Sequence, residues 1–202
     1  MHQSYEDLLK EFQDKYNQFR RSDRGPIPIT VVLLRLRLIT EELGELAAAT
    51  LADDRLEIAD AMGDLGYVIM GTLIAYGMNR GTANVFEMFP AGHLIHILSA
   101  QLGTLSCVVH EAIMSTNPED PESLDRVEIC LRTMFNALVT GAIAWSIPFD
   151  AVFREIHRSN MTKAVPTISN VPGMKYGQKV GVGGKGPNYQ PPRLAEILGE
   201  SL

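Results

Sequence analysis

The chain has 202 residues, of which 46% are hydrophobic and 21% are charged, and its formal net charge is −6. This composition excludes a disordered chain, which combines low hydrophobicity with high net charge, and it supports a buried core. The slight acidic excess also argues against a protein that binds duplex nucleic acid. The charges are unevenly placed: residues 41–64 hold eight acids and one base, whereas residues 154–193 hold one acid and seven bases.

Helical periodicity dominates the sequence, and no segment alternates at period two over the length of a strand. We therefore predict an all-α fold, with Pro and Gly clusters at residues 25–28 and 118–121 marking breaks between helices. The helices are expected, in chain order, over residues 4–19, 30–50, 57–76, 94–114, 124–146 and 149–163, with a short one near Leu194.

The segment 51–56 is too short for anything but a tight reversal, so the second and third helices should run antiparallel. Glycine weakens an isolated helix by about 1 kcal/mol relative to alanine. Gly44, Gly63, Gly66 and Gly71 nevertheless lie in these two helices. We expect close helix approach to compensate for each of them.

Residues 1–165 are predicted to form one helical domain, followed by a Gly/Pro-rich basic tail over residues 166–202. A weak repeat divides the domain into halves over about 30–90 and 92–163, because residues 42–46 match 101–105 and residues 71–76 resemble 141–145. The second copy lacks the acids, with Gln101 in place of Glu42 and Thr104 in place of Glu45. The alternative is that Leu/Ala/Gly-rich helices align by chance.

Cys107 and Cys130 stand in apolar stretches without metal-ligand spacing, so we expect two buried thiols in a reducing compartment. The N-terminal segment has no apolar core of a signal peptide. The longest uncharged run, residues 88–110, contains Pro90, His93 and His96, which argue against a membrane span. The expected location is the cytoplasm.

Acidic side chains recur at helical spacing on both arms of the predicted hairpin. Glu42 and Glu45 share one helical face, and Glu57, Asp60 and Asp64 share another. Opposed across the hairpin, these carboxylates would repel one another unless a cation lies between them. Oxygen ligands without His or Cys favour Mg²⁺, for which Mn²⁺ can substitute. The alternative is a solvated helix face whose charge is balanced by salt bridges, with Arg35, Arg37 and Arg55 as partners.

These residues also carry a family resemblance. Residues 40–46 (TEELGEL) followed by 57–60 (EIAD) resemble the EExxE…ExxD motif of the all-α nucleoside triphosphate pyrophosphohydrolases, the MazG and dimeric dUTPase superfamily. Residues 152–163 and 185–194 resemble the C-terminal motifs of small MazG-like members. The resemblance covers about residues 30–77 and 149–198. The departure is the segment 78–148, which we interpret as the second half of a single-chain pseudo-dimer.

The resemblance implies Mg²⁺-dependent hydrolysis of a (deoxy)nucleoside triphosphate to the monophosphate and pyrophosphate. By the same resemblance, the metal ligands would be Glu42, Glu45, Glu57 and Asp60. Asp64 would extend the set toward a further metal or a metal-bound water. Glu41 is the candidate general base, with a role in capping or solvating the helix as the alternative.

Basic and amide residues would bind the substrate. Lys163 and Asn160 share a helical face suited to phosphate and sugar, whereas Arg158 either joins them or pairs with Glu155. Lys185 lies in a basic segment that either folds over the phosphates or is a plain tail. Asn79 either reads the base or ribose, or caps a helix. His157, Tyr67 and Trp145 are expected to pack in the core rather than to bind.

Two other functions stay open at this point. Phosphoribosyl-ATP pyrophosphohydrolase is the near alternative within the superfamily, and a catalytically silent helical interaction module is the alternative outside it. The family also implies a homo-oligomer, a dimer or a tetramer. No motif in the sequence identifies the preferred base.

Overall fold

A computed structural model describes residues 3–81, 89–90, 92–114, 120–164 and 184–200. Within these ranges the protein is all-helical, which confirms the predicted fold class, and its only β pairing is an isolated bridge between Ala164 and Gly184. The helices are α1 (Tyr5–Lys15), α2 (Ile29–Ala52), α3 (Arg55–Ala75), α4 (His93–Met114), α5 (Pro121–Ala144), α6 (Phe149–Asn160) and α7 (Leu194–Leu198).

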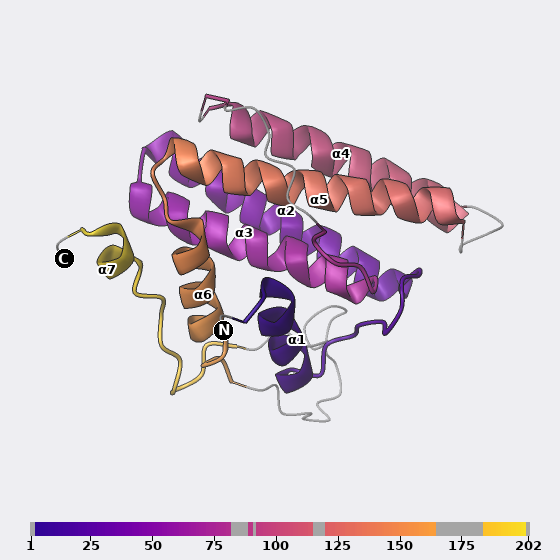
Figure 1. Ribbon diagram of the computed structural model, residues 1–202, viewed down its shortest axis with the longest axis horizontal. Coiled ribbons are helices and arrows are strands. Elements are labelled where there is room, and N and C mark those ends of the chain that lie inside the picture. Colours follow the sequence, from indigo (N-terminus) through magenta and orange to yellow (C-terminus); the bar gives the residue numbers. More distant parts are fainter. Residues whose placement is uncertain (1–2, 82–88, 91, 115–119, 165–183, 201–202) are drawn as a thin grey trace, which may run out of the picture.

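Two antiparallel hairpins, α2–α3 and α4–α5, form the body of the molecule and lie side by side (Figure 1). The shorter helices α1 and α6 pack on α3 and also reach Phe135 of α5, and α7 contacts both α3 and α6. Helix α3 is therefore central, with 15 buried residues among its 21. Residues on α3 are shielded from water by helices on several sides.

The reversal between α2 and α3 is tighter than the predicted linker. Asp53 ends α2 in the left-handed conformation, with φ of 54°. Asp54 begins α3, because its carboxylate accepts hydrogen bonds from the backbone N–H groups of Leu56 and Glu57, both at 3.1 Å. This turn sets the register in which the acids of the two helices face each other.

Other boundaries differ from prediction for local reasons. Helix α5 begins at Pro121 rather than near residue 124, since Asp120 accepts a hydrogen bond from the Ser123 N–H and proline suits a first helical turn. Helix α1 ends at Lys15 and α6 at Asn160, each a few residues before the predicted end. Of the predicted tail, residues 165–183 lie outside the described part of the chain, and residues 184–200 include α7.

The expected close approach at glycines is confirmed at three positions and wrong at one. A Cβ on Gly63 would lie 2.6 Å from Ile156 of α6, and one on Gly66 would lie 2.8 Å from Phe149. At Gly71 the nearest atom is a guanidinium nitrogen of Arg35, at 3.1 Å. Gly44, by contrast, has no atom within 4 Å of such a Cβ. The glycines of α3 thus let α6 and Arg35 pack closely against its backbone.

Two further expectations concern exposure. Cys130 is buried, but Cys107 lies on the exposed face of α4, so the prediction of two buried thiols is wrong for Cys107. By length and composition alone, α3, α4 and α5 are apolar enough to cross a membrane. Their most apolar stretches are 83%, 22% and 61% buried within the protein, respectively. The absence of a membrane span stays a prediction.

Candidate metal and phosphate site

The hairpin brings together the five acids that sequence reasoning assigned to a metal. Glu42 and Glu45 project from α2, and Glu57, Asp60 and Asp64 project from the antiparallel α3. Glu45 and Glu57 are exposed, whereas the other three are partly buried. The cluster therefore runs from the surface into the protein.

The electrostatics of these carboxylates show that they act on one another. Burial raises the pKa of Glu42 to about 8, with further contributions from the charges of Asp64 and Glu45. Burial likewise raises the pKa of Asp60 to about 7, helped by Asp64, Glu57 and Glu45. The pKa of Asp64 is also raised, mainly by burial. A cation placed among these groups would reverse the destabilisation that their shared negative charge causes.

The donor set fits a hard divalent cation. Asp60 Oδ1 is a buried oxygen without a hydrogen-bond partner in the described part of the protein, and such a group normally has one. All the converging ligands are carboxylate oxygens, the type that Mg²⁺ and Mn²⁺ prefer. Within the described ranges, no three His, Cys, Asp or Glu side chains are arranged so that they could hold a metal ion by themselves. The cluster is still compatible with Mg²⁺, because one or two carboxylates, several waters and substrate phosphates commonly complete the shell of this ion.

Two lysines and an amide border the acidic cluster. Burial raises the pKa values of these acids, and the lysine charges offset part of that rise. Lys163 acts in this way on Glu42 and Asp64, and Lys185 acts on Asp60 and Asp64. The Asn160 side chain hydrogen-bonds to Asp64. The structure thus places Asn160, Lys163 and Lys185 beside the acids, as the predicted phosphate-binding role requires.

Helix α1 holds the end of α6 that carries two of these residues. The Tyr16 hydroxyl contacts the backbone carbonyl of Asn160 at 2.8 Å and that of Lys163 at 2.7 Å. The Lys15 ammonium donates to the Met161 carbonyl. These bonds satisfy carbonyls that the end of α6 leaves free and hold Lys163 over the cluster.

Three predicted site residues lie elsewhere. The Glu41 carboxylate accepts a hydrogen bond from Arg37 at 2.9 Å on the exposed face of α2. Arg158 binds Glu155, the arrangement left open as its alternative, and also donates to the Pro191 carbonyl at 2.9 Å. Asn79 Oδ1 accepts from the Gly81 N–H and from Arg132, each at 3.0 Å.

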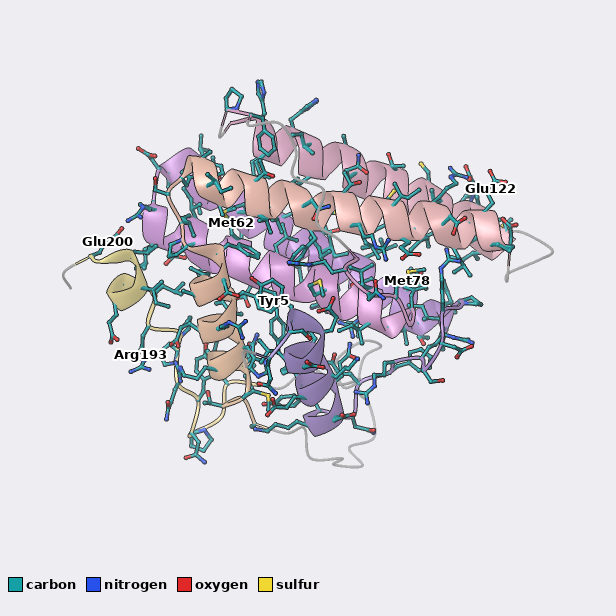
Figure 2. All side chains as sticks on the ribbon, viewed as in Figure 1. Tyr5, Met62, Met78, Glu122, Arg193 and Glu200 are labelled. Atoms are coloured by element: carbon teal, nitrogen blue, oxygen red, sulfur yellow. The ribbon has the colours of Figure 1, made fainter. Side chains whose placement is uncertain are left out.

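The place of Asn79 along the chain explains its separation. Met62 stands between Asp60 and Asp64 in sequence, and Met78 precedes Asn79. Figure 2 shows Met62 and Met78 toward opposite ends of the α3 region. Asn79 therefore serves a local turn rather than the acidic cluster.

Two pockets adjoin the cluster. One, of about 120 Å³, holds the polar side chains Gln18, Arg35, Glu42, Asp64, Asn160 and Lys163 and the apolar or aromatic side chains Leu9, Phe12, Leu38, Tyr67 and Val68. The other, of about 330 Å³, lies between Glu57 and Asp60 on α3 and the segment 191–196. We call the first the inner pocket and the second the outer pocket.

Sequence reasoning missed Arg35 as a pocket residue and treated it only as a partner for the acids. Among the ion pairs of the described ranges, Arg37 pairs with Glu41 and Arg55 with Glu200, but Arg35 pairs with no carboxylate. A signal was present in the sequence. Arg35 stands at helical spacing between Val31 and Ile39, both buried, so it interrupts an apolar face.

His157 and Tyr67 follow the predicted packing role. His157 Nδ1 lies 3.0 Å from the Tyr67 hydroxyl, and burial lowers the pKa of the histidine. Tyr67 is buried between Phe12 and Phe153, with ring centroids at 5.3 and 5.5 Å. The pair fixes one wall of the inner pocket.

Comparison with known proteins agrees with this site. Residues 9–87 match the family model described as PRA-PH, phosphoribosyl-ATP pyrophosphohydrolase. The uncharacterized protein L479 of Acanthamoeba polyphaga mimivirus is 29% identical over 146 residues, which make up 65% of this chain and 58% of that protein. The chain thus covers less than two thirds of this relative, and no solved structure matches it. The segment 9–87, which carries all five clustered acids, is thus similar to the PRA-PH family of the MazG-like all-α nucleoside triphosphate pyrophosphohydrolase superfamily.

Proposed function

We propose that the protein hydrolyses a (deoxy)nucleoside triphosphate to the nucleoside monophosphate and pyrophosphate, using Mg²⁺ held by the acidic cluster. The observation that carries this proposal is the partly buried group Glu42, Asp60 and Asp64, with raised pKa values, beside two lysines. A negatively charged cavity bordered by cations suits a divalent ion together with a triphosphate.

Each group has a role in this proposal. Glu42, Glu45, Glu57 and Asp60 would hold the ion, with Asp64 at the inner edge of the set. When bound, the ion supplies charge neutralisation and a more acidic bound water. Lys163 and Lys185 bind phosphate oxygens, and Asn160 keeps Asp64 oriented through their hydrogen bond.

A second candidate is hydrolysis of phosphoribosyl-ATP, the activity for which the matching family model is named. Both reactions cleave the bond between two phosphates and release pyrophosphate, so the acidic cluster serves either. The proposals differ in the base and sugar that the inner pocket must accept.

The test is a screen of ribo- and deoxyribonucleoside triphosphates and phosphoribosyl-ATP, with Mg²⁺ or Mn²⁺, that follows pyrophosphate release. The preferred substrate decides between the two reactions. Asp60→Asn should abolish release while circular dichroism shows a folded protein. Absence of turnover with every substrate would refute the enzymatic proposal and favour a silent helical interaction module.

A further inference from the structure

Arg35 is a buried cation without a carboxylate partner in the described part of the protein. The residue is 7% exposed. One terminal nitrogen donates to Gln18 Oε1 at 3.0 Å, but Nε is buried without a hydrogen-bond partner. Burial also lowers the pKa of the guanidinium to about 10. Burying an unpaired charge is costly, so this arrangement indicates that an acceptor from outside the chain completes the site.

The inner pocket supplies room for that acceptor next to the acidic cluster. Helices α2 and α3 are antiparallel, so the inner pocket runs along both of them. Glu42 and Asp64 mark one end, Arg35 and Gly71 mark the other, and Leu38 lies between. Seven residues of helix separate Arg35 from Glu42, or about 10 Å. A nucleoside can bridge this interval when its 5′ phosphates lie at the acids.

The side chains between the two ends favour a planar ring over a phosphate at Arg35. Leu9, Phe12, Leu38 and Val68 line this part of the inner pocket. Apolar walls suit the faces of a nucleobase, whereas a phosphate there would lose its hydration without further cations. Lys163 and Lys185 stand at the acidic end instead.

The second hairpin shows that packing alone does not call for an arginine. Extending the match of residues 42–46 with 101–105 back along both helices pairs Arg35 with Leu94, and Gly71 is matched with Gly141. A Cβ on Gly141 would lie 2.7 Å from Leu94, just as one on Gly71 would lie 3.1 Å from Arg35. The equivalent contact is thus made by a fully buried leucine.

We propose that Arg35, positioned by Gln18, reads the edge of the substrate base and selects bases with two adjacent hydrogen-bond acceptors. This inference rests on the proposed function and names its substrate class. A guanidinium only donates, and its two parallel N–H groups match O2 and N3 of cytosine or O6 and N7 of guanine. Uracil and thymine present N3–H, and adenine presents its amino group. Each of these donors would face an N–H donor of the guanidinium, so no second hydrogen bond could form.

The test measures binding, so that it does not depend on turnover. The α,β-imido analogues of dCTP, dGTP, dUTP and dATP are titrated into the full chain with Mg²⁺. The dCTP or the dGTP analogue should bind about tenfold or more tighter than the dUTP and dATP analogues, the discrimination typical of a bidentate contact. Which of the two binds tighter identifies the base.

Three variants make the test specific to Arg35. Arg35→Met keeps the unbranched part of the side chain without the guanidinium and should abolish the preference, leaving affinity for the dUTP analogue within about threefold of the unchanged protein. Arg35→Lys keeps the charge without the two parallel donors and should weaken the preference. Arg126→Met is the matched control, because Arg126 is an exposed residue of α5 that pairs with Glu111; it should bind like the unchanged protein.

Thermal melts show whether each variant is folded, and Arg35→Lys decides the matter if Arg35→Met does not fold. Equal binding of all four analogues would overturn the inference, as would a base preference that survives the loss of the guanidinium. The proposed function would still be supported in either case if pyrophosphate release is observed. Failure to bind any analogue, together with no release from any substrate, would refute both.

Discussion

The two helical hairpins share a frame but differ in what that frame carries. Extending the match of residues 71–76 with 141–145 back along α3 and α5 places three apolar residues where the first hairpin has acids. Val127, Cys130 and Met134 stand in place of Glu57, Asp60 and Asp64, and all three are buried. The same helical positions therefore serve as core in one hairpin and as a candidate metal site in the other.

The hairpins also differ in how they are covered. Helix α3 is packed by α1 and α6 as well as by its neighbours in the bundle, so its acids lie in a partly desolvated place. Within the described residues, helix α4 packs only against α2 and α5, and five of its 22 residues are buried. The comparison teaches that the chemistry of the site depends on the short helices α1 and α6 as much as on the acids.

The largest expected effect comes from giving α3 the residues of α5. The triple variant Glu57→Val, Asp60→Cys, Asp64→Met should lose at least about a thousandfold in kcat/KM, because a metal ion contributes several kcal/mol to the transition state. Its thermal stability without metal should not fall, since buried like charges are removed. Steady-state kinetics and melting curves measure both. The variant Thr104→Glu on α4 is the control and should keep full activity; turnover by the triple variant would contradict the proposed function.

A smaller effect should follow from separating α6 from α3. Gly63→Ala places a methyl group where Ile156 and Val152 already lie within 3 Å, so we expect a loss of about 1–3 kcal/mol in unfolding free energy. Urea denaturation measures this loss. KM should also rise, because Asn160 is the last residue of α6 and Lys163 follows three residues later. Unchanged stability would mean that the two helices are not in close contact.

The raised pKa values predict how pH and Mg²⁺ act together. Glu42 and Asp60, with pKa values near 8 and 7, bind more protons in the folded metal-free protein than in the unfolded chain. Their contribution to stability is thus present at low pH and is lost as pH rises through 7 and 8. Mg²⁺ binds the ionised carboxylates, so it should raise Tm by a few degrees more at pH 8.5 than at pH 6. For a protein of this size, a change of about 1 kcal/mol in stability shifts Tm by roughly 2–4 °C. Differential scanning calorimetry measures this difference, and an equal increase at both pH values would contradict the ligand assignment.

Glu41 offers a comparison within one helix turn. Its carboxylate pairs with Arg37 on the exposed face of α2 instead of joining the acidic cluster, so Glu41→Gln should change kcat/KM by less than about threefold. Glu42→Gln, one residue along, should abolish activity. A loss of a hundredfold or more in Glu41→Gln would instead establish Glu41 as the general base predicted from the sequence.

The smallest effect should be the same in both hairpins. Gly44 and Gly103 are matched by the repeat, and neither has an atom within 4 Å of an added Cβ. Gly44→Ala and Gly103→Ala should each stabilise the protein by up to about 1 kcal/mol, measured by urea denaturation. Opposite signs at the two positions would break the correspondence between the hairpins.

The sequence predicted the helices well because helical spacing of apolar residues is repeated over many turns. The acidic cluster was predicted from the short segment 51–56, which leaves only an antiparallel arrangement of α2 and α3, and its role as a metal site stays a prediction. The pair Arg37–Glu41 is local, since the two residues stand four apart on one helix, but local patterns could not show that Arg132 engages Asn79 from a different helix. Arg35 stands on an apolar helix face that the sequence shows, but its place in a pocket depends on α1, α3 and the segment after α1, which a single helix does not reveal.

The attachment of α6 to α1 through Lys15 and Tyr16 divides the site between two stretches of the chain. The acids lie inside the segment that matches the PRA-PH family, whereas Asn160 and Lys163 lie beyond its end. Mutations can therefore alter the phosphate-contacting residues without disturbing the carboxylates, provided that the bonds from α1 are kept. Such a division gives this architecture a route to new substrates that leaves the proposed metal ligands intact.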